Sequence, residues 1–143
     1  MNRLRFAGIP IVVGLLMALA AATPSKPIMS HDPNAKRPFG LTFDKGAEWI
    51  CWAFASHNQT LIQGGETVQY IPRKCYEIPP TLTSMRENWE DIICTDVTPT
   101  GLVPCKSVDT WDVTATAQYP NPPDENGVVT FISVDSNTIT VKH

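Results

Sequence analysis

The chain has 143 residues, of which 43% are hydrophobic and 17% are charged, and its formal net charge at pH 7 is −3. A chain of this length forms one domain with a hydrophobic core. Its acidic balance argues against binding to nucleic acid or to an anionic membrane, because both require a basic surface.

The first 22 residues have the three parts of a secretory signal peptide. Arg3 and Arg5 precede an apolar run over residues 6–19, and small residues follow at Ala20 and Ala22. A membrane anchor is the alternative, but the run is shorter than the about 20 residues that span a bilayer. We expect cleavage after Ala20 or Ala22, secretion to the extracellular space, and no membrane attachment afterwards. Cleavage removes two arginines and no acidic residue, so the net charge becomes −5.

Residues 23–40 contain four prolines among serine, lysine and asparagine. Such a segment has too little apolar content to fold alone. We therefore expect a flexible leader over residues 23–40 and a single domain over residues 41–143. Lys36-Arg37 within the leader is either a dibasic processing site or an ordinary pair of solvated charges.

A strand is expected over residues 48–54, with apolar side chains on both faces. Alternation places Trp49 and Cys51 on one face and Trp52 on the other. A hairpin should follow, with strands over residues 60–62 and 67–71 on either side of Gly64-Gly65.

Residues 83–93 are the one helix candidate. Ser84 and Glu87 fit a capping box, in which each side chain satisfies a backbone donor at the helix start. Three apolar residues would then share one helix face: Met85, Trp89 and Ile92.

The C-terminal third is expected to be β-structure. Apolar residues alternate with polar ones over residues 111–117, as in a half-buried strand. A loop over residues 119–124 and the turn dipeptide Asn126-Gly127 follow, and two β-branched runs, residues 128–134 and 138–141, should pair as a terminal hairpin. The fold class predicted is all-β or mainly β: a small disulfide-linked β-sandwich or barrel with at most one short helix.

The four cysteines, Cys51, Cys75, Cys94 and Cys105, all lie after the signal peptide, and an even number in a secreted chain predicts two disulfides. Sequence alone leaves all three pairings open. We favour Cys51–Cys75 with Cys94–Cys105, because the second pair would close a short loop that contains proline and glycine. Close cysteine or histidine spacings typical of zinc sites are missing, so we expect no metal and no cofactor.

Catalytic candidates are few. His57 is the one histidine that a fold could position, and a ribonuclease would combine it with Arg73, Glu66 and Glu77 as clamp, acid and base. A glycosidase would need two carboxyl groups, for which Glu87, Glu90 and Asp91 are candidates. Their alternative role is a solvated helix face. Neither set forms a recognisable motif, so we expect no enzymatic activity and keep a small secreted hydrolase as the alternative.

Three features point to contacts with other molecules. Asn58-Gln59-Thr60 is an N-glycosylation acceptor. Trp49 and Trp52 point to opposite faces of one strand, so at least one of them is expected at a contact surface. The loop that begins at Tyr119 and Asn121 is a second candidate surface, since loops on rigid β scaffolds carry recognition.

The signal peptide, proline-rich leader, four cysteines and β-rich remainder resemble the small secreted cysteine-containing proteins of fungi, many of which are effectors that act on a host. A weaker local likeness, carried by Cys75, Cys94 and Trp89, is to the β-barrel family of a major mould allergen. In that family the tryptophan lies nearer the cysteine, and no binding residue is transferred. The resemblance implies a monomeric, secreted, non-enzymatic interaction protein acting on a host protein or glycan.

Overall fold

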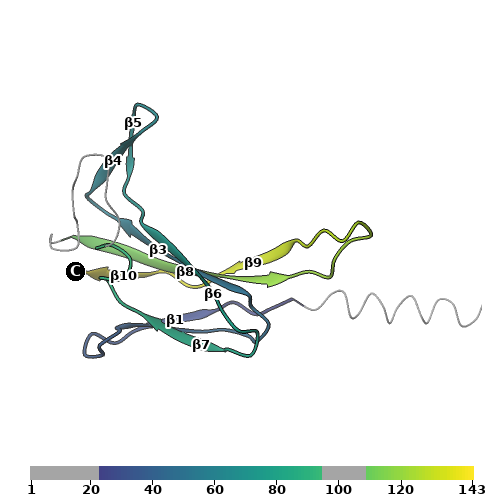
Figure 1. The fold of residues 1–143 in the computed structure, drawn as a ribbon. Coiled ribbons are helices and arrows are strands. Elements are labelled where there is room, and N and C mark those ends of the chain that lie inside the picture. Colours follow the sequence, from purple (N-terminus) through teal and green to yellow (C-terminus); the bar gives the residue numbers. More distant parts are fainter. Residues whose placement is uncertain (1–22, 95–108) are drawn as a thin grey trace, which may run out of the picture.

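The computed structural model describes residues 23–94 and 109–143. These ranges contain ten strands and no helix (Figure 1). The predicted fold class, a small all-β protein with a disulfide, is confirmed. The strands are β1 (Ile28–His31), β2 (Phe39–Thr42), β3 (Trp49–Ser56), β4 (Thr60–Gln63), β5 (Glu66–Gln69), β6 (Arg73–Glu77), β7 (Ser84–Glu87), β8 (Thr110–Pro120), β9 (Phe131–Asp135) and β10 (Ile139–Lys142).

Two sheets enclose the core. The small sheet has the order β1-β2-β7, and the large sheet has the order β10-β8-β3-β6, with β9 also paired to β8. The β4–β5 hairpin projects beyond the large sheet (Figure 1). Its base continues the pairing of β3, because the N–H of Ser56 donates to the carbonyl of Tyr70 at 2.9 Å. Gly64 and Gly65 have φ values of 61° and 80°, which explains why glycines occupy the predicted turn.

The core lies between the sheets and is built from alternate residues of β3 and β8. On β3 the even-numbered residues from Ile50 to Ser56 are buried, and on β8 the odd-numbered residues from Trp111 to Tyr119 are buried. Phe39 and Leu41 of β2 cover them from the small sheet. The strands predicted at residues 48–54 and 111–117 are therefore confirmed.

The helix predicted over residues 83–93 is wrong. Residues 84–87 form β7, which pairs antiparallel with β2 so that Met85 lies opposite Leu41 and Glu87 opposite Phe39. Met85 and Glu87 are the less exposed residues of this strand, which is a period of two. Pairing with β2 outweighed a local pattern that also suits a helix, as tertiary context often does.

The prediction of a flexible leader is wrong from residue 28 onward. There β1 pairs with β2, with Ile28 opposite Thr42 and His31 opposite Phe39. Met29 is only 4% exposed. The prolines of this segment lie outside β1 itself, where they do not remove a ladder hydrogen bond. The folded domain therefore begins before residue 41.

The predicted terminal hairpin is also wrong, because β9 and β10 do not pair with each other. Both pair with β8: Asp135 lies opposite Thr116 and Ile139 opposite Val113. Three residues of the edge strand thus face two of β8, which is a β-bulge. At the bulge, the N–H of Ala115 donates to the Ser136 hydroxyl at 3.0 Å.

The bulge also joins the two sheets. The side chain of Asn137 accepts a hydrogen bond from the N–H of Met29 at 2.7 Å and donates one to the Met29 carbonyl at 3.1 Å. One carboxamide therefore pairs with β1 as a strand residue would.

Candidate functional site

The large sheet turns one face away from the core, and we call this the outer face. Its side chains come from alternate residues of the strands, and the cross-strand register places them in rows. One row contains Glu77, Trp49, Gln118 and Ser133. The next contains Cys75, Cys51, Thr116 and Asp135. The row beyond it contains Arg73, Ala53 and Thr114.

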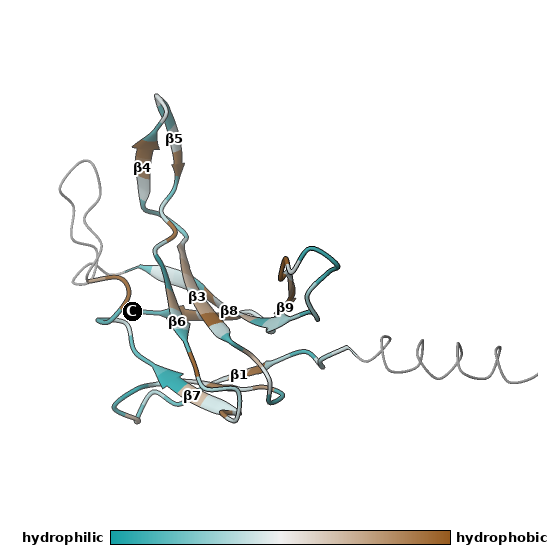
Figure 2. Cartoon of the chain, turned by 45° about the vertical axis from the view of Figure 1, so that its right-hand side comes forward, coloured by the Kyte–Doolittle hydropathy of each residue, from teal (hydrophilic) through white to brown (hydrophobic). Residues whose placement is uncertain are grey.

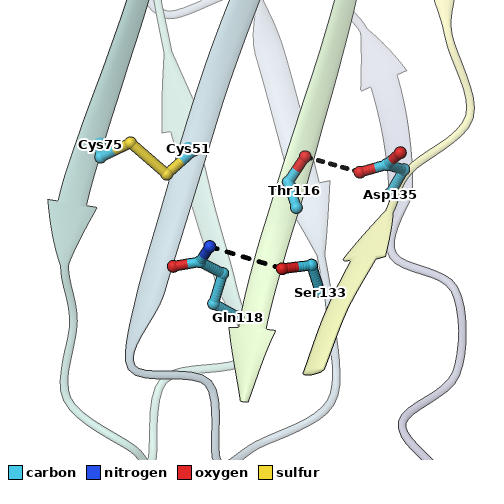
Figure 3. Close-up of a disulfide and its surroundings, with 6 residues drawn as sticks. All are labelled: Cys51, Cys75, Thr116, Gln118, Ser133 and Asp135. Atoms are coloured by element: carbon cyan, nitrogen blue, oxygen red, sulfur yellow. Dashed lines mark hydrogen bonds between the residues drawn. A yellow bond between two sulfur atoms is a disulfide. The ribbon is translucent and has the colours of Figure 1, made fainter. Parts of the chain in front are cut away.

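The predicted Cys51–Cys75 disulfide is confirmed and lies on the outer face, between residues directly opposite each other on β3 and β6 (Figure 3). It is partly exposed, since Cys75 is an exposed residue. Cys94 is half-buried. Cys105 lies outside the described residues, and so does the predicted second disulfide.

Polar side chains hold the other half of the outer face together. Thr116 donates to the Asp135 carboxylate at 2.7 Å, and the Gln118 amide donates to the Ser133 hydroxyl at 3.4 Å (Figure 3). Further along, Thr140 donates to Asp112 at 2.6 Å. The face is thus cross-linked between β3 and β6 by a disulfide and between β8 and its neighbours by hydrogen bonds.

Trp49 is the one tryptophan on this face. It is half-buried, whereas Trp52 and Trp111 are completely buried and Trp89 packs against the core. The expectation that Trp52 contributes to a contact surface is therefore wrong, because alternation on β3 directs it into the core.

The second predicted surface also needs correction. Tyr119 is 6% exposed and its hydroxyl donates to the Asp44 carbonyl at 2.9 Å. Asn121 continues the pairing of β8 with the chain leading into β9, because its N–H donates to the Thr130 carbonyl at 2.8 Å. These residues build the β8–β9 hairpin, and Tyr119 offers no free surface.

Sequence reasoning missed Phe131. It lies opposite Pro120, one row beyond Gln118 and Ser133 on the outer face, and is 40% exposed. Figure 2 shows hydrophobic residues near the start of β9 and along β4, toward the ends of the two projecting hairpins. The signal was present in the sequence: an aromatic residue soon after the Asn126-Gly127 turn, in phase with outward-facing residues.

The ribonuclease candidates are not brought together. The His57 ring lies 3.0 Å from the Asp112 carboxylate. Hydrogen bonds lower the pKa of Asp112, and the bond from Thr140 contributes more to this than the bond from His57. Glu77 is opposite Trp49 at the far end of β3, which at about 3.3 Å per residue is roughly 25 Å from His57. Ser56 precedes His57 but is buried, and its hydroxyl donates to Asp109 on the inner side.

Glu87, expected on a solvated flank, is 2% exposed. It accepts a hydrogen bond from the Asn88 N–H at 3.1 Å. It is also hydrogen-bonded to the Tyr76 hydroxyl and to the Asp91 carboxyl group. Burial raises the pKa of Glu87, and the bond to Asp91 raises it further. Burial also raises the pKa of Tyr76, as does its bond to Glu87. This cluster joins β6 to β7, and the carboxyl group of Glu87 at its centre is out of reach of a substrate.

Asn58 is exposed in the turn between β3 and β4, so its glycosylation stays a prediction. Residues 23–94 and 109–143 contain no group of three or more potential metal-ligating side chains. The same ranges contain no helix that could cross a membrane. No family model, curated protein or solved structure matches this chain.

Proposed function

We propose that the protein is a secreted, non-enzymatic, effector-like interaction protein that binds a host protein or glycan through the Trp49 end of its outer face. The observation that carries the proposal is the pair of aromatic side chains at this end, Trp49 and Phe131, which stand on the face and not in the core.

The rigidity of the outer face supports its choice as the binding surface. Binding energy concentrates in a few aromatic or arginine side chains surrounded by polar contacts that exclude water. Here Gln118 and Ser133 lie between Trp49 and Phe131, and hydrogen bonds and the disulfide hold the strands in place. A face that is already ordered loses little conformational entropy when it binds.

The alternative, a small hydrolase, has less support. Within the described residues, His57 has a carboxylate partner but no nucleophile beside it, and the carboxyl group of Glu87 is buried. A general base needs to reach the proton that it removes, and a nucleophile needs its base within hydrogen-bond reach.

The test is binding of the oxidised, secreted protein to host extracts and to a glycan array, with the variants Trp49→Ala and Phe131→Ala. Both should weaken a saturable interaction at least about tenfold, the weight of an interface anchor. Ile62→Ala is the matched control, because Ile62 is a 49% exposed apolar residue on the other projecting hairpin. Equal binding by all three variants and the unaltered protein would place the contact elsewhere.

A further inference from the structure

A hollow of about 350 Å³ lies between the β1–β2 loop and the turn that follows β7. Pro33, Lys36 and Pro38 line it from the loop, and Asn88, Trp89 and Glu90 line it from the turn. None of these residues belongs to the large sheet, so the hollow is separate from the outer face and an inference about it does not depend on the proposed function.

Trp89 is a rigid wall of this hollow. Four rings meet it edge to face: Phe39 at 4.9 Å, His143 at 4.7 Å, Phe54 at 5.5 Å and Trp111 at 6.4 Å between centroids. Aromatic rings packed in this way have a preferred geometry and little freedom to turn. The part of the indole that faces the hollow is therefore held in position before any ligand arrives.

The opposite wall is also fixed by hydrogen bonds. The N–H of Asp32 donates to the Pro38 carbonyl at 2.8 Å, which closes the loop. The guanidinium of Arg86 donates to the Arg37 carbonyl at 2.8 Å, which fastens the loop to β7. Prolines at positions 33 and 38 restrict the backbone further.

The polar groups at the hollow include both hydrogen-bond donors and hydrogen-bond acceptors. The Lys36 ammonium and the Asn88 amide nitrogen are donors, and the Glu90 carboxylate is an acceptor. The amide oxygen of Asn88 already accepts a hydrogen bond from the Asp91 N–H at 2.8 Å, so its nitrogen is the group left to face a ligand. Lys36 and Glu90 carry opposite charges, which cancel and disfavour a strongly charged ligand.

We infer that this hollow binds one or two units of a neutral sugar, with a ring over Trp89 and its hydroxyl groups bonded to Lys36, Asn88 and Glu90. A pyranose ring presents C–H groups to an aromatic face and hydroxyl groups that both donate and accept around its rim. Ligand sites commonly combine an apolar wall with a few convergent polar groups, and this volume is within their usual range. An extended peptide would instead need a longer groove or a free sheet edge.

The test is NMR titration of the oxidised, secreted protein with methyl glycosides and β-linked oligosaccharides of glucose, mannose, galactose and N-acetylglucosamine. We expect saturable shifts of the Trp89 indole N–H and the Asn88 side-chain amide. Lys36→Ala and Glu90→Ala should each weaken binding by about fivefold, the effect of one lost hydrogen bond. Lys26→Ala and Glu125→Ala are the matched controls, since both side chains are exposed and outside the hollow.

Trp89→Ala would disturb the aromatic cluster, so Trp89→Phe is the variant to use, with circular dichroism as the check on folding. Trp49→Ala should leave the sugar shifts unchanged, which separates this inference from the proposed function. Shifts confined to the outer face would overturn the inference. So would no shift with any of these sugars in the millimolar range, or shifts at the hollow caused only by a proline-rich peptide.

Discussion

Replacing the buried Glu87 with glutamine tests how the open edges of β6 and β7 are held together. A hydrogen bond between the carboxyl groups of Glu87 and Asp91 requires one proton, and burial, which raises the pKa of Glu87, favours the protonated form of that residue. Glutamine has nearly the same shape. Its amide oxygen accepts from Tyr76 and Asn88, and its amide nitrogen donates to Asp91 without a titratable proton.

The pH dependence follows from the direction of the shift. The pKa of Glu87 in the folded protein lies above its ordinary value of 4.5, so the folded state binds the proton more tightly than the unfolded state. The stabilisation is complete below about pH 4.5 and is lost as the pH rises through the folded-state pKa. Glu87→Gln should remove this part of the pH dependence and be more stable than the unaltered protein at pH 8.

The substitution Glu87→Leu measures how much the hydrogen bonds of Glu87 contribute to the free energy of unfolding. It removes the partner of the Tyr76 hydroxyl and of the Asp91 carboxyl, both of which are half-buried. At about 1 kcal/mol for each such group left without a partner, the free energy of unfolding at pH 5 should fall by about 2 kcal/mol. The loss should be smaller at pH 8, where the unaltered protein has itself been weakened.

The assay is urea unfolding of the three proteins between pH 4 and pH 8, followed by tryptophan fluorescence. The stability of the unaltered protein should decline across this range, and that of Glu87→Gln should decline less. A pH slope that is the same in both proteins would refute the assignment of the shared proton to Glu87.

Three further predictions concern stability. Phe54→Ala empties part of the core under Trp89 and should lower the free energy of unfolding by about 3–5 kcal/mol in denaturant titrations; a loss below 1 kcal/mol would mean that Phe54 is not packed as described. Reducing Cys51–Cys75, whose sequence separation is 24, should cost about 3.5 kcal/mol in thermal or denaturant unfolding; an unchanged stability would show that the strands alone hold this pairing. Asn137→Ala should cost about 1–2 kcal/mol and speed hydrogen exchange at the Met29 amide, because two hydrogen bonds to β1 are lost. If that exchange rate stays the same, Asn137 is not what holds β1.

The parts of the fold that sequence predicted are those in which one strand carries its own pattern. On β8 apolar residues alternate with polar ones over residues 111–117, so the buried face is unambiguous. On β3 both faces carry apolar residues, so the sequence predicted the strand but not which of Trp49 and Trp52 is buried. β7 is only four residues long, and the same residues also fit the start of a helix, because Ser84 and Glu87 match a capping box and Met85 is in helical phase with Trp89 and Ile92. β1 has no alternation of its own and is a strand because β2 and Asn137 pair with it.

The candidate sites were harder to predict, because they join residues far apart in the chain. Trp49 was named from the sequence as a surface candidate, and the structure places it half-buried on the outer face. Phe131 lies on the same face as Trp49 only because of the register of β9 with β8. The sequence suggested instead that β9 would pair with the last strand. The hollow at Trp89 places Lys36 opposite Glu90, and no local pattern links a loop near the N-terminus to a turn in the middle of the chain.

The carboxamide of Asn137 has a further consequence for the behaviour of the protein in concentrated solution. Edge strands present free backbone groups on which other chains can assemble, and proteins usually block them with proline, lysine or a bulge. β1 has the sequence Ile-Met-Ser-His and contains neither proline nor lysine. Its backbone at Met29 is nevertheless occupied by a side chain from the bulge of the opposite sheet. A strand of another molecule would have to displace Asn137 before it could add to this edge, so one asparagine protects the β1 edge of the small sheet against aggregation.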